Sequence, residues 1–283
     1  MKQDDPIAMY KLPLLLLLSL FALSSYGQAL YISHCVAACP SGSANSNDLV
    51  VRNLYAASVN RDSQLADWVA YRVLADTIGV ASLLPREWHS DGLLEAGLKV
   101  EDLDNSRRSR AIANGSENPD ENSYRIAQSL IDVQDRGRLV PMSSFAGTSY
   151  WEDMNSLTNM GGMKQDMRLG PWARLDQAVN SLAQQHGELF VISGPLYEIG
   201  TSISRLNSAD QALQSHQAVA FFKLIASAQG QVSVFIFSQQ LQQHKPFCTS
   251  LSNLNELEQR SSLDLFPRQT QWPIGNLDAA LGC

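Results

Sequence analysis

A helix-period segment followed by three strand-length apolar runs constrains the fold of this chain more than any other feature. In residues 170–187, Pro171 suits a first helical turn and Gly187 is a typical stop. The apolar side chains between them recur at helical spacing, at Trp172, Leu175, Val179 and Leu182. Three compact β-branched and aromatic runs of strand length follow, at residues 188–197, 218–227 and 231–238. The chain is therefore expected to combine one central helix with several strands.

Residues 53–73 predict a β-hairpin ahead of that helix. Two alternating runs lie in this stretch, separated by the polar residues 60–64, NRDSQ. The alternation gives the second strand one face with Trp68, Ala70 and Arg72 and another with Val69, Tyr71 and Val73. Strands thus precede and follow the helix. Because no internal repeat or linker divides the chain, we expect a single α+β domain.

A polar segment at residues 101–123 interrupts this pattern. It is rich in charge and poor in apolar side chains, which is typical of a long surface loop or an insertion. Its RRSR stretch, residues 107–110, either contacts a substrate or is simply solvated.

Length and charge limit the classes of function. With 283 residues and 45% hydrophobic content the chain can bury a substantial core. Its formal net charge of −7 repels a polyanion over the molecule as a whole. Any binding of nucleic acid therefore requires a local cluster of arginine and lysine.

The first residues resemble an export signal. Residues 12–23 form an apolar run that is followed by small residues, which predicts a secretory signal peptide over 1–27 with cleavage after Gly27. Met9 is the expected initiator, because the acidic pair before it suits a signal poorly. The mature domain would span 28–283 and be secreted or periplasmic, without a stable membrane anchor. An uncleaved anchor is the alternative, although the run is shorter than the ~20 residues that a span needs.

Export makes disulfides the expected state of the four cysteines. An even number of cysteines in an oxidising compartment favours disulfide pairing over free thiols. We expect bonds between Cys35 and Cys39 and between Cys248 and Cys283. A zinc site made of the four cysteines, with His34 or His244 nearby, is the alternative.

A series of short motifs, in order, resembles a known enzyme family. The motifs are CVAACPSG (35–42), WVAYRV (68–73), PREWHSD (85–91), DRGR (135–138), SYWEDMNSLTNM (149–160), GPWARLD (170–176) and VISGPLYE (191–198). They resemble the DNA/RNA non-specific endonuclease family, secreted nucleases with a ββα-metal active site. The resemblance implies an antiparallel central sheet with helices packed on it, a Mg²⁺ cofactor and hydrolysis of DNA and RNA phosphodiesters.

The general base of the family is replaced in this sequence. The family motif reads DRGH, and its histidine activates the attacking water; the matching residue here is Arg138. A general base must offer a lone pair near neutral pH, whereas a guanidinium has only donors and stays protonated. Arg138 cannot serve as that base.

The resemblance also places the metal site on altered residues. The asparagine that ligates Mg²⁺ in the family corresponds to Arg168, which has the wrong charge and offers no oxygen. Asp176 replaces a glutamate that holds the water shell of the metal, and Asn180 replaces a catalytic arginine. The metal site of the family is therefore not expected in its usual form.

Other site positions match the family. Arg86 and Arg136 match its phosphate-contacting arginines, and Asn155 and Asn159 match two asparagines of its active-site loop. Forked guanidinium groups bind phosphate oxygens in a bidentate way. We therefore expect Arg86, Arg136, Arg138 and Arg168 to converge on a cleft that holds the phosphates of DNA, RNA or another polyanion, with hydrolysis impaired.

Two alternatives remain open from the sequence. In the first, the site has decayed without a ligand, Arg138 and Arg168 pair with Asp135, Asp176 or Glu152, and the protein is a structural or partner-binding relic. In the second, the enzyme is active with a rearranged base and metal, His89 acting as the base and Glu152 with Asp153 holding a relocated ion. A surface position for His89 is favoured over a catalytic one.

Overall fold

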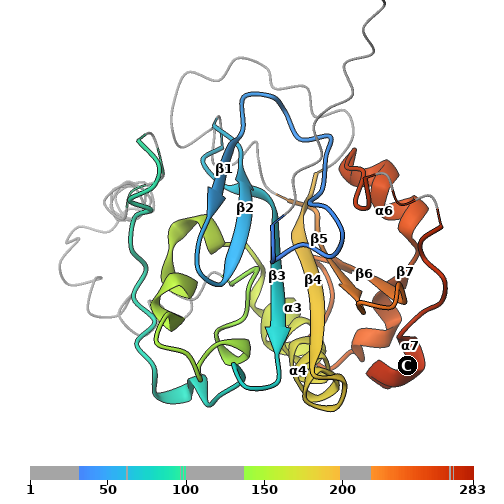
Figure 1. Ribbon diagram of the computed structural model, residues 1–283. Coiled ribbons are helices and arrows are strands. Elements are labelled where there is room, and N and C mark those ends of the chain that lie inside the picture. Colours follow the sequence, from blue (N-terminus) through green and yellow to red (C-terminus); the bar gives the residue numbers. More distant parts are fainter. Residues whose placement is uncertain are drawn as a thin grey trace, which may run out of the picture.

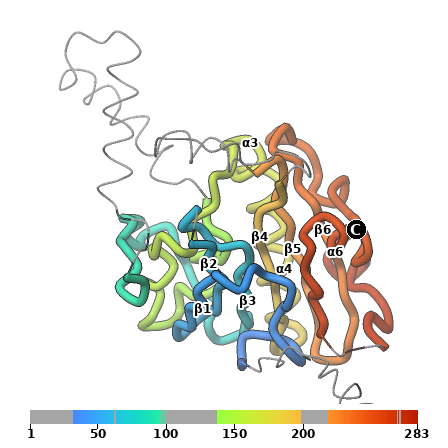
Figure 2. Tube along the Cα trace, turned by 90° about the horizontal axis from the view of Figure 1, so that it is seen from above, coloured from blue at the N-terminus to red at the C-terminus, as the bar shows by residue number. Residues whose placement is uncertain are grey.

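A seven-stranded antiparallel sheet organises the part of the chain that the computed structural model describes, residues 32–61, 63–95, 97, 99, 137–197, 218–267, 269 and 271–283 (Figure 1). The strands are β1 (Asp48–Val51), β2 (Tyr55–Val59), β3 (Ala66–Leu74), β4 (Glu188–Leu196), β5 (Ala220–Ala226), β6 (Val232–Ser238) and β7 (Leu251–Ser252). Their order in the sheet follows their order in the chain. Seen from above, the chain advances across the sheet from β1 toward the C-terminal segments (Figure 2). The expected α+β class and antiparallel sheet are confirmed.

The predicted hairpin is the β2–β3 pair, in which Tyr55 faces Tyr71. Trp68 and Ala70 lie in one buried apolar cluster, whereas Val69, Tyr71 and Val73 lie in another. The two clusters occupy opposite faces of the sheet because successive side chains of a strand point to opposite sides. The three later strand predictions correspond to β4, β5 and β6, so they are confirmed as well.

Helices cover both faces of the sheet. They are α3 (Gln165–Met167), α4 (Ala173–His186), α6 (Leu254–Ser261) and α7 (Asp278–Leu281). Leu175 and Val179 of α4 pack in the cluster that contains Tyr71. Leu257 of α6 packs in the cluster that contains Trp68. The sheet is thus a central layer between α4 on one side and α6 on the other.

The predicted central helix is confirmed, with a difference at its start. α4 begins at Ala173 and ends at His186, and it is followed by Gly187, whose φ of 87° is easily adopted by glycine. Pro171 lies before α4 in η5 (Arg168–Trp172), a short π-helical turn. Gly170 breaks the helical path there with φ −100° and ψ −110°. The backbone of Gln243 lies against it, and a Cβ on Gly170 would be 2.3 Å from the Gln243 oxygen. Close backbone packing therefore sets the helix start.

The remaining short elements are 3₁₀ turns, and several of them carry the candidate site. They are η1 (Ala81–Leu83), η2 (Met142–Ser144), η3 (Trp151–Asn155), η4 (Leu157–Asn159) and η6 (Phe247–Ser250). Residues 137–163 thus contain no strand of the main sheet, and they lead directly into α3 and α4.

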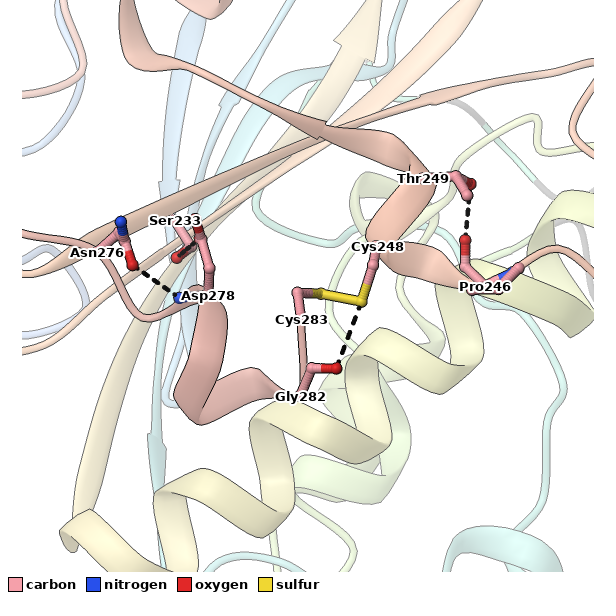
Figure 3. The surroundings of a disulfide bond; sticks show 8 residues. All are labelled: Ser233, Pro246, Cys248, Thr249, Asn276, Asp278, Gly282 and Cys283. Atoms are coloured by element: carbon pink, nitrogen blue, oxygen red, sulfur yellow. Dashed lines mark hydrogen bonds between the residues drawn. A yellow bond between two sulfur atoms is a disulfide. The ribbon is translucent and has the colours of Figure 1, made fainter.

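Both predicted disulfides are present. Cys35 bonds Cys39, and Cys248 bonds Cys283. The zinc alternative is wrong, because all four sulfur atoms are used in these bonds. The second disulfide joins η6 to the C-terminal end of the chain beside α7 (Figure 3). The Ser233 hydroxyl of β6 donates to the Asp278 carboxylate in the same corner, so α7 is held by both bonds.

Two predictions from the sequence lie outside the described residues, the signal peptide over 1–27 and the loop at 101–123. Among the residues that are described, no helix is long and apolar enough to cross a membrane.

Candidate functional site

Gly137 and Arg138 lie on a short ladder that pairs residues 137–139 with 159–161. The Leu139 N–H donates to the Asn159 oxygen at 3.0 Å, and the Gly161 N–H donates to the Gly137 oxygen at 2.9 Å. Gly137 has a φ of 105°, and a Cβ there would be 2.8 Å from the sulfur of Met163. Glycine is required at this point both by conformation and by close packing. Asp135 and Arg136, the preceding residues, lie outside the described range.

Arg138 is buried, with 8% of its surface exposed. Its Nε donates to the Met154 oxygen at 3.2 Å. Its Nη2 donates to the Asn155 side-chain oxygen at 2.6 Å and to the Arg86 backbone oxygen at 3.3 Å. The guanidinium carbon lies 4.4 Å from the centre of the Trp88 ring. Arg138 therefore joins two loops and also stacks on an aromatic face.

The side chains of Asn155 and Asn159 form hydrogen bonds to the same loops. The Asn155 amide donates to the Pro85 oxygen at 3.0 Å, while its oxygen accepts from Arg138. The fully buried Asn159 side chain accepts from the Val140 N–H at 2.7 Å and donates to the Val140 and Met154 oxygens, each at 3.0 Å. Both amides satisfy backbone groups that lie outside regular structure.

A second polar cluster surrounds the buried carboxylate of Asp91. The carboxylate accepts from the Thr158 hydroxyl at 2.8 Å, the Ser156 hydroxyl at 3.1 Å and the Leu93 N–H at 2.9 Å. The Arg52 guanidinium completes the cluster with an ion pair to Asp91. Burial acts to raise the pKa of Asp91, but the Leu93 N–H, the Thr158 hydroxyl and Arg52 lower it below its ordinary value.

Arg168 lies in η5 and is also buried, at 7% exposure. Its N–H donates to the Lys164 oxygen at 3.0 Å. Six residues later, Arg174 donates to the backbone oxygens of Gln243 at 2.9 Å and of Lys245. Together with the contact between Gly170 and Gln243, these bonds fix residues 243–245 across the beginning of α4.

Asp176, on the first turn of α4, forms a buried ion pair with Lys223 of β5. Lys223 is completely buried, and its ammonium lies 3.9 Å from the centre of the Trp172 ring. Burial lowers the pKa of Lys223 and raises that of Asp176, because each loses water around its charged form. The pair neutralises a carboxylate that would otherwise be a costly isolated charge.

Asn180 lies one turn further along α4 and joins the helix to η2. Its side-chain oxygen accepts from the Ser144 hydroxyl at 2.6 Å, and its amide donates to the Ser143 hydroxyl at 3.2 Å. The position is mostly buried, so Asn180 acts here as a link between two elements.

Comparison with known proteins identifies the family of this chain. The model of the DNA/RNA non-specific endonuclease family matches residues 37–270. The chain belongs to that family. A nuclease of Serratia marcescens is 29% identical over 89% of this chain and 90% of its own length. Nuclease C1 of Cunninghamella echinulata var. echinulata is 24% identical over 84% of this chain and 90% of its own.

A solved structure has a fold similar to that of this endonuclease family member. A crystal structure of the complex of EndoG with EndoGI matches with a TM-score of 0.55, at 16% identity, over 77% of this chain and 85% of that one. At such low identity the likeness concerns the fold alone. It supports the ββα-metal nuclease fold that the motifs imply.

Nucleases of this family typically use a divalent metal ion, but the two residues at the implied metal positions do not fit one. Magnesium prefers oxygen ligands, whereas Arg168 offers only N–H donors and a positive charge. Asp176 does offer oxygens, but its carboxylate already accepts from the Lys223 ammonium. These two positions therefore do not supply the oxygen ligands that a divalent cation needs.

The structure assembles part of the predicted site of the endonuclease. Arg138 and Asn155 contact each other, and Arg86 is joined to them through its backbone oxygen, while its side chain is exposed. Asn159 lies on the same loops, and Asp176 lies with Lys223 on the α4 side. Convergence of all four arginines on one cleft stays a prediction.

His89 lies at the surface, as the sequence favours. Its two ring nitrogens face the backbone oxygens of Ser90 at 3.3 Å and of Glu152 at 3.1 Å. Both nitrogens thus face backbone carbonyl oxygens, an arrangement that does not suit a nitrogen that must accept a proton from water.

Sequence reasoning missed Lys223, Trp88 and Arg52. Lys223 carries the clearest signal, because it is a lysine inside the apolar run 218–227, and such a residue is rarely buried without a partner. Trp88 and Arg52 gave no comparable signal, since a tryptophan or an arginine near a loop is common.

Proposed function

We propose that this protein binds the sugar-phosphate backbone of DNA or RNA, or another polyanion, through arginine side chains, while its phosphodiester hydrolysis is strongly impaired. The observation that carries the proposal is the state of Arg138. It stands where the family resemblance puts the general base, it is buried, and its Nε and Nη2 donate to protein acceptors. Loss of a general base typically costs about 10²–10⁴-fold in rate.

The proposed binding residues differ in exposure. The side chain of Arg86 is exposed, so we propose it as the main phosphate contact. Arg136 is proposed as a second contact because it matches a phosphate-contacting arginine of the family. Arg138 and Arg168 belong to the proposed set as well, but both are buried. Asn155 and Asn159 support the loops, because their amides bind protein backbone groups.

We further propose that Mg²⁺ is bound poorly and that the protein acts outside the cytoplasm. Arg168 and the Asp176–Lys223 pair argue against a cation at the implied metal positions. The two disulfides support an oxidising compartment, in line with the expected signal peptide over residues 1–27.

A binding and cleavage assay tests the proposal. Fluorescence anisotropy with labelled DNA and RNA of equal length would be followed from low to high salt, and plasmid digestion would be followed with added Mg²⁺. We expect similar affinity for both polymers, a steep loss of affinity with salt, and cleavage near background. Arg86→Ala and Arg136→Ala should each weaken binding and reduce the salt slope by about one unit.

Arg61→Ala is the matched control, since Arg61 is an exposed arginine between β2 and β3 that pairs with Asp48 of β1. It should leave the salt slope unchanged. Robust cleavage that His89→Ala abolishes would instead establish the active enzyme, and absence of binding at low salt would leave only a relic of the fold.

A further inference from the structure

We infer that Arg138 is a positioning residue that holds Arg86 in place for the phosphate, rather than a phosphate ligand itself. The inference rests on the proposed function, because it names how the arginine set is organised. It is independent of the comparison with relatives, since it follows from contacts that Arg138 makes in this chain.

The first step is the pair of segments that Arg138 joins. Its Nε and Nη2 reach the Met154 oxygen and the Asn155 side chain on η3, and Nη2 also reaches the Arg86 backbone oxygen. One guanidinium therefore bonds both η3 and the segment 85–89, which we call the arginine segment. The bond to the Arg86 oxygen fixes the residue whose side chain is exposed.

The second step is the way the arginine segment is attached elsewhere. The Asn155 amide donates to the Pro85 oxygen at 3.0 Å. At the other end the His89 N–H donates to the Asn155 oxygen, and the Leu157 N–H donates to the His89 oxygen, each at 3.0 Å. Both ends are thus bonded to residues 155–157, and between them Arg86 is held by Arg138.

The third step is the reason for an arginine at this point. A guanidinium is a planar fork with five donors, so it can bond several carbonyl oxygens while its face stacks on an aromatic ring. Arg138 uses both properties, because it donates to several oxygens and its guanidinium carbon lies over the ring of Trp88, a member of the arginine segment. A lysine would supply charge without the fork or the plane, and a histidine has at most two donors.

These contacts predict an unexpected effect of replacing Arg138 by the histidine of the family motif. Arg138→His would restore the family motif, yet it would leave the Asn155 side-chain oxygen and the Arg86 backbone oxygen short of a donor, while the Met154 oxygen would keep the Asn159 amide. We therefore expect this substitution alone to loosen the arginine segment and to weaken binding of nucleic acid.

The experiment compares Arg138→Lys with Arg138→Gln, alone and combined with Arg86→Ala. Hydrogen exchange would be measured at the backbone amides of residues 86–89, since Pro85 has none, and DNA affinity and its salt slope would be measured by anisotropy. A positioning role predicts that both single variants raise exchange in the arginine segment by about tenfold. Both should weaken DNA binding about as much as Arg86→Ala does. The double variant Arg86→Ala/Arg138→Gln should bind no worse than Arg86→Ala, with the same salt slope.

If Arg138 instead binds phosphate directly, the binding measurements should give the opposite results. Arg138→Lys would then keep most of the affinity, and the double variant would lose a further unit of salt slope. That result, or unchanged exchange at residues 86–89 in both single variants, overturns the inference. Arg174→Gln is the matched control, because Arg174 also clamps backbone oxygens, those of residues 243 and 245. It should raise exchange at 243–245 and leave the arginine segment unchanged.

Failure of the proposed function is a separate outcome. If the wild-type protein binds neither DNA nor RNA at low salt, the proposed function is wrong, and the inference falls with it as a statement about phosphate. The exchange measurement would still show whether Arg138 holds the arginine segment.

Discussion

Two regions of the molecule are held together by different means. The loop region, residues 85–91 with 137–160, relies on side chains that bond backbone groups, chiefly Arg138, Asn155 and Asn159. The C-terminal region, residues 247–283, relies on apolar packing by α6 and α7 and on the disulfide at Cys248. The first region carries the candidate site, and the second closes the other end of the sheet.

The difference follows from secondary structure. The loop region consists mainly of 3₁₀ turns and isolated bridges, so many of its backbone groups find no partner in a helix or strand. Buried polar groups must be bonded, and here specific side chains supply the bonds. The loop region should therefore be sensitive to single polar substitutions, whereas the C-terminal region should respond mainly to loss of its covalent bond.

The largest effect is expected at the ion pair that joins α4 to β5 between the two regions. Lys223→Met leaves the Asp176 carboxylate buried without its cation, which should lower the free energy of unfolding by about 3–5 kcal/mol. Urea unfolding monitored by circular dichroism measures this. The double variant Asp176→Leu/Lys223→Met should cost less than Lys223→Met alone, because no charge is then left unpaired. An equal or larger cost in the double variant would contradict this account.

The C-terminal region is tested next by removing its disulfide. Cys248→Ser/Cys283→Ser opens a loop with a sequence separation of 35 residues, and we expect a loss of about 3–4 kcal/mol. Hydrogen exchange should rise in α7 and η6 and stay unchanged at residues 85–91. Increased exchange at those loop residues would show that the two regions are not independent.

Asp91 tests the loop region through its charge. Asp91→Asn removes the ion pair with Arg52 and disturbs bonds from Thr158 and Leu93, and it should cost about 1–3 kcal/mol at pH 7.

The pH dependence of stability provides a second measurement of the role of Asp91. The pKa of Asp91 is lowered in the folded state, so its stabilisation is fully present above the unfolded value of about 3.9. It is lost as the pH falls from there through the lowered folded pKa. Thermal unfolding from pH 6 to pH 2 should therefore show a shallower acid loss in Asp91→Asn than in the wild type. Parallel curves would argue against a lowered pKa.

The smallest effect is expected at the surface pair of Arg61 and Asp48, which lies in neither region. Both side chains reach solvent, where water and salt screen the pair. Arg61→Ala should leave the melting temperature unchanged within error. A clear drop would mean that exposed ion pairs matter more in this protein than the comparison assumes.

The elements of the fold follow local patterns closely. The helix α4 and the β2–β3 hairpin were predictable because neighbouring residues show a hydrophobic periodicity of 3.6 or 2. The two disulfides were predictable because each cysteine had a partner that chain order and export made reasonable. The displaced start of α4 was not, since it depends on Gln243, far along the chain from Gly170.

By itself, the sequence determined the α+β class, the order of the elements, the family and the chemical identity of the altered residues, including the fact that Arg138 is no base. Only the tertiary structure decided where those side chains donate. Arg138 meets Arg86 and Asn155, and Asp176 meets Lys223, across large separations along the chain. Local propensity contains no information on such contacts, because they arise when the sheet and α4 bring distant segments together and each buried polar group takes the partner within reach.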